Sequence, residues 1–215
     1  MNILFYRYGS ICEPDIIASF KHLGFNITED TREVYNKQLL PSDCIKGLNE
    51  LLKQDTYSFI FSINFFPSVS DVCNIWGIPY LCLIVDSPVL ELFSTSLANP
   101  CNKVFLFDRQ LYNDFHHINP DGIFHIPLAT NVRDNYATAT MASAADRARF
   151  SSDISFIGSL YSEKCLYNKI TLPEKMRGYV DGLIEAQLLV YGYNFIEECV
   201  TPELIDSFTK ARPEL

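Results

Sequence analysis

Short polar segments directly follow four strongly apolar segments of the chain, and they contain the residue types that could bind a ligand. The apolar segments have the composition of buried parallel strands, whose carboxyl ends meet at one edge of a sheet. Ligands of open parallel sheets bind in the crevice at that edge. The sequence therefore predicts a site lined by Tyr8, Gly9, Ser10, Asn64, Phe65, Asp86, Ser87 and Asp108.

Asp86 is the sharpest of these candidates because it directly follows the apolar segment 79–85, "PYLCLIV". A carboxylate buried there without a partner would cost several kcal/mol. In one interpretation Asp86 caps the following turn through Ser87 and Pro88. In the other, its carboxylate binds a polar ligand such as a sugar hydroxyl, or acts as a base. Asp108 immediately precedes a helical pattern, which favours an N-cap role for it.

Several catalytic and nucleotide-binding signatures are absent from the sequence. The segment after the first apolar stretch reads "RYGS", without the G-x-G-x-x-G pattern of a dinucleotide-binding loop. Neither a P-loop nor a G-x-S-x-G nucleophile elbow occurs. His116 and His117 lie on an expected helix without evident partners, so we expect packing or surface roles for them and no metal site.

The composition restricts the class of protein and its compartment. The 26 acidic and 17 basic residues give a net charge of −9, which argues against a nucleic-acid partner. The seven cysteines form no C-x-x-C pair and mostly lie in apolar segments, as expected for reduced thiols in the cytoplasm. The amino terminus has no signal-peptide pattern, and the longest apolar stretch is too short to cross a bilayer.

The elements that must position the candidate residues alternate between strand and helix over residues 1–135. Helical patterns of ten to fifteen residues separate the expected strands, which indicates right-handed βαβ units and a doubly wound, Rossmann-like parallel sheet. Gly24 is expected to end the first helix, and Ser42 or Asp43 to cap the second. The expected strands are 2–8, 25–30, 58–64, 79–85, 103–108 and 122–129.

A second unit is expected after an alanine-rich connector at 136–152. Residues 153–160, "DISFIGSL", have a strand pattern that ends in Gly158 and Ser159, and helical patterns follow. A strand ending in Gly-Ser can bring backbone N–H groups close to a ligand, and Lys164 could then meet a phosphate. An ordinary strand-to-helix turn is the alternative. We therefore expect residues 153–215 to be the beginning of a second α/β domain.

The ordered segments resemble the amino-terminal half of bacterial CgeB-like (spore-maturation-protein-like) GT-B glycosyltransferases. The resemblance covers nearly the whole chain and rests on "NILFYRYGS", "GIPYLCLIVDSP", "NKVFLFDR", "HIPLATN" and "DISFIGSLYSEK". Such enzymes have two Rossmann-like domains that face each other across a cleft. The first domain holds the acceptor and the second holds the nucleotide-sugar donor.

The resemblance implies that residues 1–135 form the acceptor-side domain and that the crevice binds a glycan, a polysaccharide precursor or a protein. It implies that Asp86 contacts the acceptor or acts as a base, and that Gly158, Ser159 and Lys164 face the donor diphosphate. No cofactor is expected beyond the nucleotide-sugar substrate. Most of the donor-domain pattern does not occur in this sequence, so we expect no transfer by this chain alone unless the natural protein continues or a partner supplies that domain.

Two alternatives remain open from the sequence. One is a non-catalytic α/β ligand-binding module; a receiver domain is disfavoured because the first strand ends in "RYGS" and not in an acidic cluster. The other is a protein-interaction module that docks through its carboxyl-terminal helices. The same helices could form a homo-oligomer, because their apolar faces need a partner.

Overall fold

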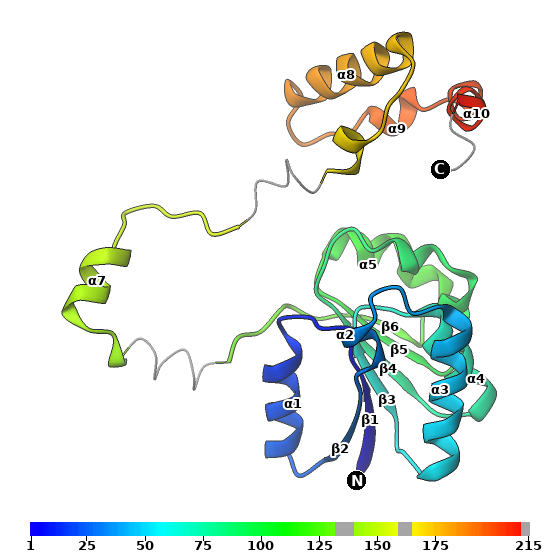
Figure 1. Ribbon diagram of the computed structural model, residues 1–215, viewed down its shortest axis with the longest axis vertical. Coiled ribbons are helices and arrows are strands. Elements are labelled where there is room, and N and C mark those ends of the chain that lie inside the picture. The colour runs from blue at the N-terminus through cyan, green and yellow to red at the C-terminus, as the bar shows by residue number, and fades with distance from the viewer. Residues whose placement is uncertain (132–139, 159–164, 212–215) are drawn as a thin grey trace. The chain divides into compact units, whose positions relative to one another are not determined.

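The computed structural model describes residues 1–131, 140–158 and 165–211, and contains a six-stranded, entirely parallel sheet with the strand order β2-β1-β3-β4-β5-β6 (Figure 1). The expected Rossmann-like α/β arrangement is therefore confirmed. The strands are β1 (Asn2–Tyr6), β2 (Asn26–Asp30), β3 (Ile60–Ile63), β4 (Tyr80–Ile84), β5 (Asn102–Leu106) and β6 (Ile123–His125).

The strand order reverses at β1, which pairs with β2 on one side and β3 on the other. The chain moves outward from this point in both directions, so the carboxyl ends of β1 and β3 flank the topological switch point. A crevice forms at such a point because the connections that leave the two strands run to opposite faces of the sheet. The fold thus brings the segments after β1 and β3 together.

Helices cover the two faces of the sheet unequally. Figure 1 shows α1 on one side of the strands and α3 and α4 on the other. The helices of the described residues are α1 (Glu13–His22), α2 (Arg32–Tyr35), α3 (Pro41–Gln54), α4 (Pro67–Trp76), α5 (Arg109–Phe115), α7 (Ala144–Phe150), α8 (Glu174–Leu188), α9 (Ile196–Cys199) and α10 (Pro202–Ala211). Short 3-10 helices occur at Leu90–Phe93, Thr95–Ala98, His116–Ile118 and Leu166–Lys169.

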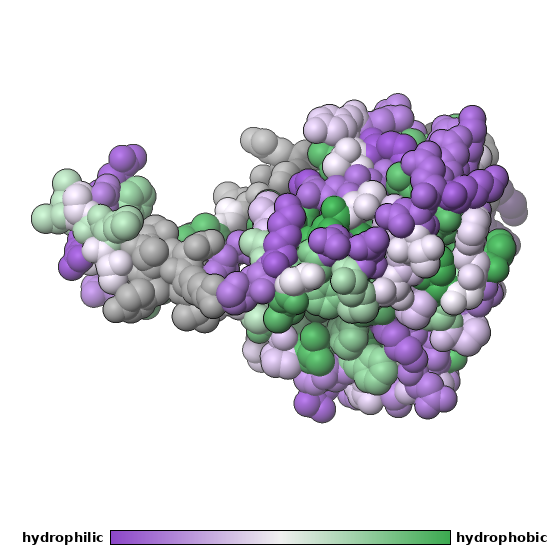
Figure 2. Space-filling view, turned by 90° about the horizontal axis from the view of Figure 1, so that it is seen from below, coloured by the Kyte–Doolittle hydropathy of each residue, from purple (hydrophilic) through white to green (hydrophobic). Residues whose placement is uncertain are grey.

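Alternate residues of β4 and β5 are fully buried on one face, under α3, α4 and α5, and only partly buried on the other. The larger core includes Leu48, Val72 and Tyr80, whereas a smaller core forms where Ile17 of α1 packs near Phe5. Figure 2 shows green apolar areas among purple polar ones on the face seen from below. The period-two burial of the strands follows from the alternation of side chains across a pleated sheet.

The expected strands of unit 1 form, but most are shorter than expected; the strand expected at 122–129, for example, is β6 at Ile123–His125. Gly24 follows α1 with φ +83, which is the left-handed conformation expected after a helix end. Neither Ser42 nor Asp43 caps α3, because the helix begins before both of them, at Pro41, with Leu40 at its N-cap position. Proline favours the first helical turn, where its missing N–H costs no hydrogen bond.

The chain divides into two compact units, Met1–Asp146 (unit 1) and Arg147–Leu215 (unit 2). Unit 2 contains α8, α9 and α10, with an apolar groove of about 310 Å³ between them. Thr201 accepts a 3.3 Å hydrogen bond from the Leu204 N–H at the start of α10, as its position before Pro202 suggests. No helix in the described part of the chain is long and apolar enough to cross a membrane.

The strand expected at 153–160 does not form in residues 153–158, the part of this segment that the structure describes. Ile154, Phe156 and Ile157 are all exposed there. An isolated strand has no partner for its backbone N–H and C=O groups, and the described residues of unit 2 contain no other strand. Apolar composition alone is therefore insufficient to produce a strand in this segment.

Candidate functional site

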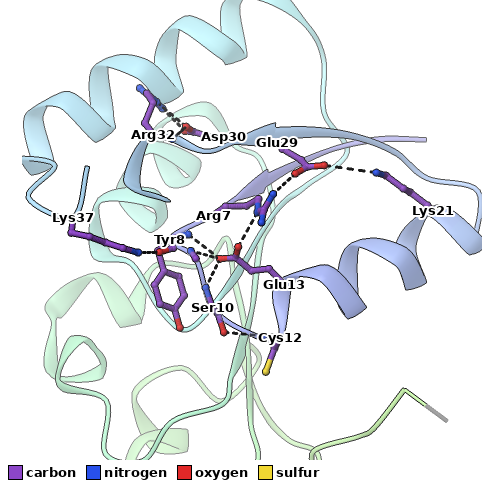
Figure 3. Close-up of polar contacts among 11 residues, drawn as sticks. Arg7, Tyr8, Ser10, Cys12, Glu13, Lys21, Glu29, Asp30, Arg32 and Lys37 are labelled. Carbon is purple, nitrogen blue, oxygen red and sulfur yellow. Dashed lines mark hydrogen bonds and ion pairs between the residues drawn. The ribbon is translucent and has the colours of Figure 1, made fainter. Parts of the chain in front are cut away.

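The loop between β1 and α1 wraps around the carboxylate of Glu13, the first residue of α1. Glu13 Oε1 accepts hydrogen bonds from three successive backbone N–H groups, at 2.9 Å from Tyr8, 2.8 Å from Gly9 and 3.1 Å from Ser10 (Figure 3). Gly9 has φ +92, a conformation that glycine adopts without steric cost. The side chain of Glu13 is completely buried, so these bonds replace its hydration.

Arg7 compensates the charge of the buried carboxylate. Its Nε lies 2.8 Å from Glu13 Oε2, and its second contact is a 2.6 Å bond to Glu29 at the end of β2. Lys21 of α1 lies 3.8 Å from the other oxygen of Glu29 (Figure 3). The hydrogen bond to Glu13 is the main cause that raises the pKa of Arg7. This chain of charges ties β1, β2 and α1 together below the crevice.

Asn64 connects the ends of three strands at the switch point. Its Nδ2 donates to the Tyr8 hydroxyl at 3.0 Å and to Asp86 Oδ2 at 2.6 Å, while its Oδ1 accepts from the Val85 N–H at 3.1 Å. Asn64 has φ +58, and it is the sole non-glycine residue with a positive φ among those described. Asparagine tolerates this region better than most residues. Asn64 therefore positions Tyr8 and Asp86 relative to each other.

Tyr8 and Asp86 differ in their surroundings. Burial, followed by the nearby carboxylates of Asp86 and Glu13, raises the pKa of the Tyr8 phenol. The phenol therefore stays protonated at neutral pH and can donate a hydrogen bond. Asp86 is exposed and takes one hydrogen bond from Asn64, which leaves acceptor positions open to a ligand.

Asp108 has the N-cap role that its position predicts. Its Oδ1 accepts from the N–H groups of Gln110 at 2.7 Å and Leu111 at 3.4 Å, at the start of α5. Its Oδ2 accepts from the Ser87 hydroxyl at 2.8 Å. These bonds, the one from Ser87 first, lower the pKa of Asp108. Ser87 thus joins the end of β4 to the cap of α5.

A cavity of about 470 Å³ lies beside these groups, between α1, the end of β4 and residues 128–131. Asp86 and Ser10 line it from the strand ends, and Asp15 lines it from α1. Asn131 Nδ2 donates to Asp15 Oδ1 at 3.0 Å, which holds the 128–131 segment against α1. Apolar surface from Ile16, Leu83 and other residues completes the walls. The mixture of apolar walls and a few polar groups is typical of a small-molecule site.

The other residues predicted for the site have different positions. The ring of Phe65 lies in the core, 1 % exposed, with its centroid 5.8 Å from that of Tyr80, so it offers no surface to a ligand. The N–H groups of Tyr8, Gly9 and Ser10 are already donated to Glu13. Gly158 is exposed at a bend of unit 2.

Two further predictions concern donor and metal sites. Ser159 and Lys164, the other donor-side candidates, lie outside the described residues. Among the residues that are described, no group of three or more His, Cys, Asp or Glu side chains could hold a metal ion. The cavity beside Asp86 is therefore the feature of unit 1 that carries a functional interpretation.

Glu13, Asp15 and Asn131 are site residues that the sequence reasoning missed. Only Glu13 had a readable signal: it is an acidic residue four positions after Gly9, directly before Pro14 at the start of a helix. Acidic residues are favoured in a first helical turn, but that preference does not predict a carboxylate turned back into the preceding loop. Asn131 lies 116 positions after Asp15, so no local pattern links the two residues.

The fold and the site together define a Rossmann-like α/β domain with a polar crevice at its switch point. Comparisons of the chain with protein families, with curated proteins and with solved structures found no match.

Proposed function

We propose that unit 1 is the acceptor-side domain of a GT-B glycosyltransferase, which transfers a sugar from a nucleotide-sugar donor to a glycan, a polysaccharide precursor or a protein. The single observation that carries this proposal is the position of Asp86. Its exposed carboxylate is held by Asn64 at the switch point and also lines the adjoining cavity. Sugar hydroxyls are donors as well as acceptors, so a carboxylate with open acceptor positions suits them.

The neighbouring groups suit the same class of ligand. Ser10 and Asp15 line the cavity from α1 and its preceding loop, and about 470 Å³ lies within the usual range for small-molecule pockets, about 300–1,000 Å³. The protonated phenol of Tyr8 and the hydroxyl of Ser87 lie beside Asp86 in the same crevice. Asp86 would accept a hydrogen bond from the acceptor hydroxyl or take its proton as a base.

The test is binding of neutral oligosaccharides to the chain and to Asp86→Asn, measured by calorimetry. We expect the variant to unfold at the same temperature as the wild type but to bind at least about tenfold more weakly, as loss of one charge-assisted hydrogen bond predicts. Asp121→Asn is the matched control, because Asp121 is an exposed aspartate before β6, at the opposite edge of the sheet. Equal affinity of Asp86→Asn and the wild type would return Asp86 to a structural role.

A non-catalytic ligand-binding module is the second candidate. In the described residues the hydrogen-bond partner of Asp86 is Asn64, and no histidine or second carboxylate bonds to it, so the site is better equipped for binding than for proton relay. A transfer assay with nucleotide-sugar donors separates the two candidates. Glycan binding without any transfer, even with a donor-side partner added, would favour the module.

The proposal also covers the cellular compartment of the protein and its association with other chains. All seven cysteines are free thiols, which supports a cytoplasmic location because reducing compartments keep thiols unpaired. The apolar groove of unit 2 is lined by Leu183, Leu204, Phe208 and other residues of its helices, and it supports a homo-oligomer through those helices or a protein partner there. That assembly stays a prediction.

A further inference from the structure

The β1–α1 loop has the geometry of an anion-binding site. Three successive N–H groups, those of Tyr8, Gly9 and Ser10, converge on one point at the amino-terminal end of α1. Such concave sets of N–H groups, reinforced by the positive end of a helix dipole, bind phosphate in many nucleotide-binding domains. The loop lies at the switch point, where ligands of this fold class bind.

An anion already occupies that point, and it belongs to the chain itself. Glu13 Oε1 lies within 3.1 Å of all three nitrogen atoms, and Glu13 Oε2 is paired with Arg7. The carboxylate is completely buried, with every oxygen satisfied. Figure 3 shows it between the loop and Arg7, bonded to both.

We infer that Glu13 is the permanent internal ligand of this loop and closes it to phosphate, so that the crevice selects an uncharged polyhydroxyl ligand over a nucleotide or a sugar phosphate. The choice of a polyhydroxyl ligand rests on the proposed function, whereas the exclusion of phosphate rests on Glu13 alone. Because Glu13 is covalently attached four residues from Gly9, its carboxylate competes with free anions at the effective concentration of an intramolecular group.

The neighbouring cations are also engaged within the protein. Arg7 is shared between Glu13 and Glu29. Lys37 donates to the Tyr8 carbonyl and lies 5.8 Å from the centroid of the Tyr8 ring. An incoming phosphate would therefore have to displace a buried carboxylate and would leave it without its partners, which is costly.

The first experiment titrates the wild-type chain with inorganic phosphate and with UDP while the amide resonances of Tyr8, Gly9 and Ser10 are followed by NMR. We expect these resonances not to move. A saturable shift of the three resonances would overturn the inference, whatever the result for glycans. Failure of glycan binding alone would instead remove the proposed function and leave the exclusion of phosphate intact.

The second experiment removes the internal ligand with Glu13→Gly. This variant should be less stable than the wild type, and phosphate should raise its Tm in a concentration-dependent way, as mass action requires for a ligand of the folded state. Glu29→Gln is the matched control: it removes the other carboxylate partner of Arg7 but leaves Glu13 in the loop, so phosphate should not change its Tm.

The outcomes of the second experiment remain decisive if folding is impaired. If Glu13→Gly folds and its Tm does not respond to phosphate, the loop is not an anion site and the inference is wrong. If the variant is unfolded in chloride, refolding in phosphate at equal ionic strength should recover it. If it folds in neither salt, the phosphate titration of the wild-type chain decides whether the loop is closed to phosphate.

Discussion

The loops that follow β1 and β4 lie at the same edge of the sheet but use their polar groups in opposite ways. In the β1 loop the N–H groups bond inward to a completely buried carboxylate, Glu13. After β4 the carboxylate of Asp86 is exposed, is held by one hydrogen bond and faces a cavity. The first arrangement stabilises the fold, and the second leaves hydrogen-bonding capacity for a ligand.

This difference teaches that the position of a residue at the crevice is insufficient to make it a binding residue. A polar group that is hydrogen-bonded within the protein must break that bond before it can bind a ligand, which costs free energy. A group that is hydrogen-bonded to water only exchanges the water for the ligand. Substitutions at Glu13, Asn64 and Asp108 test the contrast, in order of decreasing expected effect on stability, and further variants serve as comparisons.

Glu13→Ala should have the largest effect, a loss of about 3–5 kcal/mol in the free energy of unfolding, because it leaves Arg7 and three backbone N–H groups of the loop without their main partner. Asp86→Ala should cost less than about 1 kcal/mol, since its carboxylate is exposed. Urea denaturation of both variants measures the difference. Equal losses for the two would break the contrast between the loops.

Asn64→Ala should have an intermediate effect, a loss of about 2–3 kcal/mol. It removes the hydrogen bonds to Tyr8, Asp86 and Val85 and places alanine, which lacks the tolerance of asparagine for the left-handed region, at φ +58, a conformation that costs such a residue roughly 1–2 kcal/mol. Asn64→Gly is the matched variant: it loses the same bonds but tolerates this φ, so it should be about 1 kcal/mol more stable than Asn64→Ala. If the two variants are equally stable, backbone conformation contributes nothing at this position.

Asp108→Ala should have a smaller effect than Asn64→Ala, about 1 kcal/mol at neutral pH, as is usual for loss of an N-cap. The pKa of Asp108 is lowered from its usual value of 3.8, so the ionised form favours the folded state. The stability that this shift contributes is complete above the usual value and is lost as the pH falls through the lower pKa of the folded state. The difference between the wild type and Asp108→Ala should therefore shrink in strong acid.

Ser87→Ala sharpens that prediction, because the hydrogen bond from the Ser87 hydroxyl is the largest cause of the lowered pKa of Asp108. An NMR titration of the Asp108 carboxyl group should give a higher midpoint in Ser87→Ala than in the wild type, while the bonds to the Gln110 and Leu111 N–H groups persist. An unchanged midpoint would mean that the helix cap alone lowers the pKa.

Most of unit 1 could be predicted from the sequence because its signals are local. Apolar runs such as "PYLCLIV" and the helical periodicity between them predicted the six strands and their parallel arrangement. The N-cap role of Asp108 followed from its place before a helix. Residues 153–158 have a similarly apolar strand pattern but form no strand, because a strand also needs neighbours that the pattern does not supply.

The site was only partly predictable. The crevice rule selected Asp86 and Ser10, which line the cavity, but it also selected Phe65, whose ring packs into the core. The direction of a side chain just beyond a strand depends on the backbone conformation of the loop, and the sequence pattern does not specify that conformation.

The sequence by itself determined the order of strands and helices, the crevice edge and the acidic character of that edge, since these follow from local periodicity and composition. Only the tertiary structure decided which carboxylate is enclosed and which is open. Glu13 turns into the amide groups of the β1 loop because Gly9 adopts a positive φ and Arg7 lies beside it. Asp86 stays exposed because Asn64, in a left-handed conformation at the end of another strand, holds it at the crevice. Both results depend on contacts between chain segments, which no local pattern encodes.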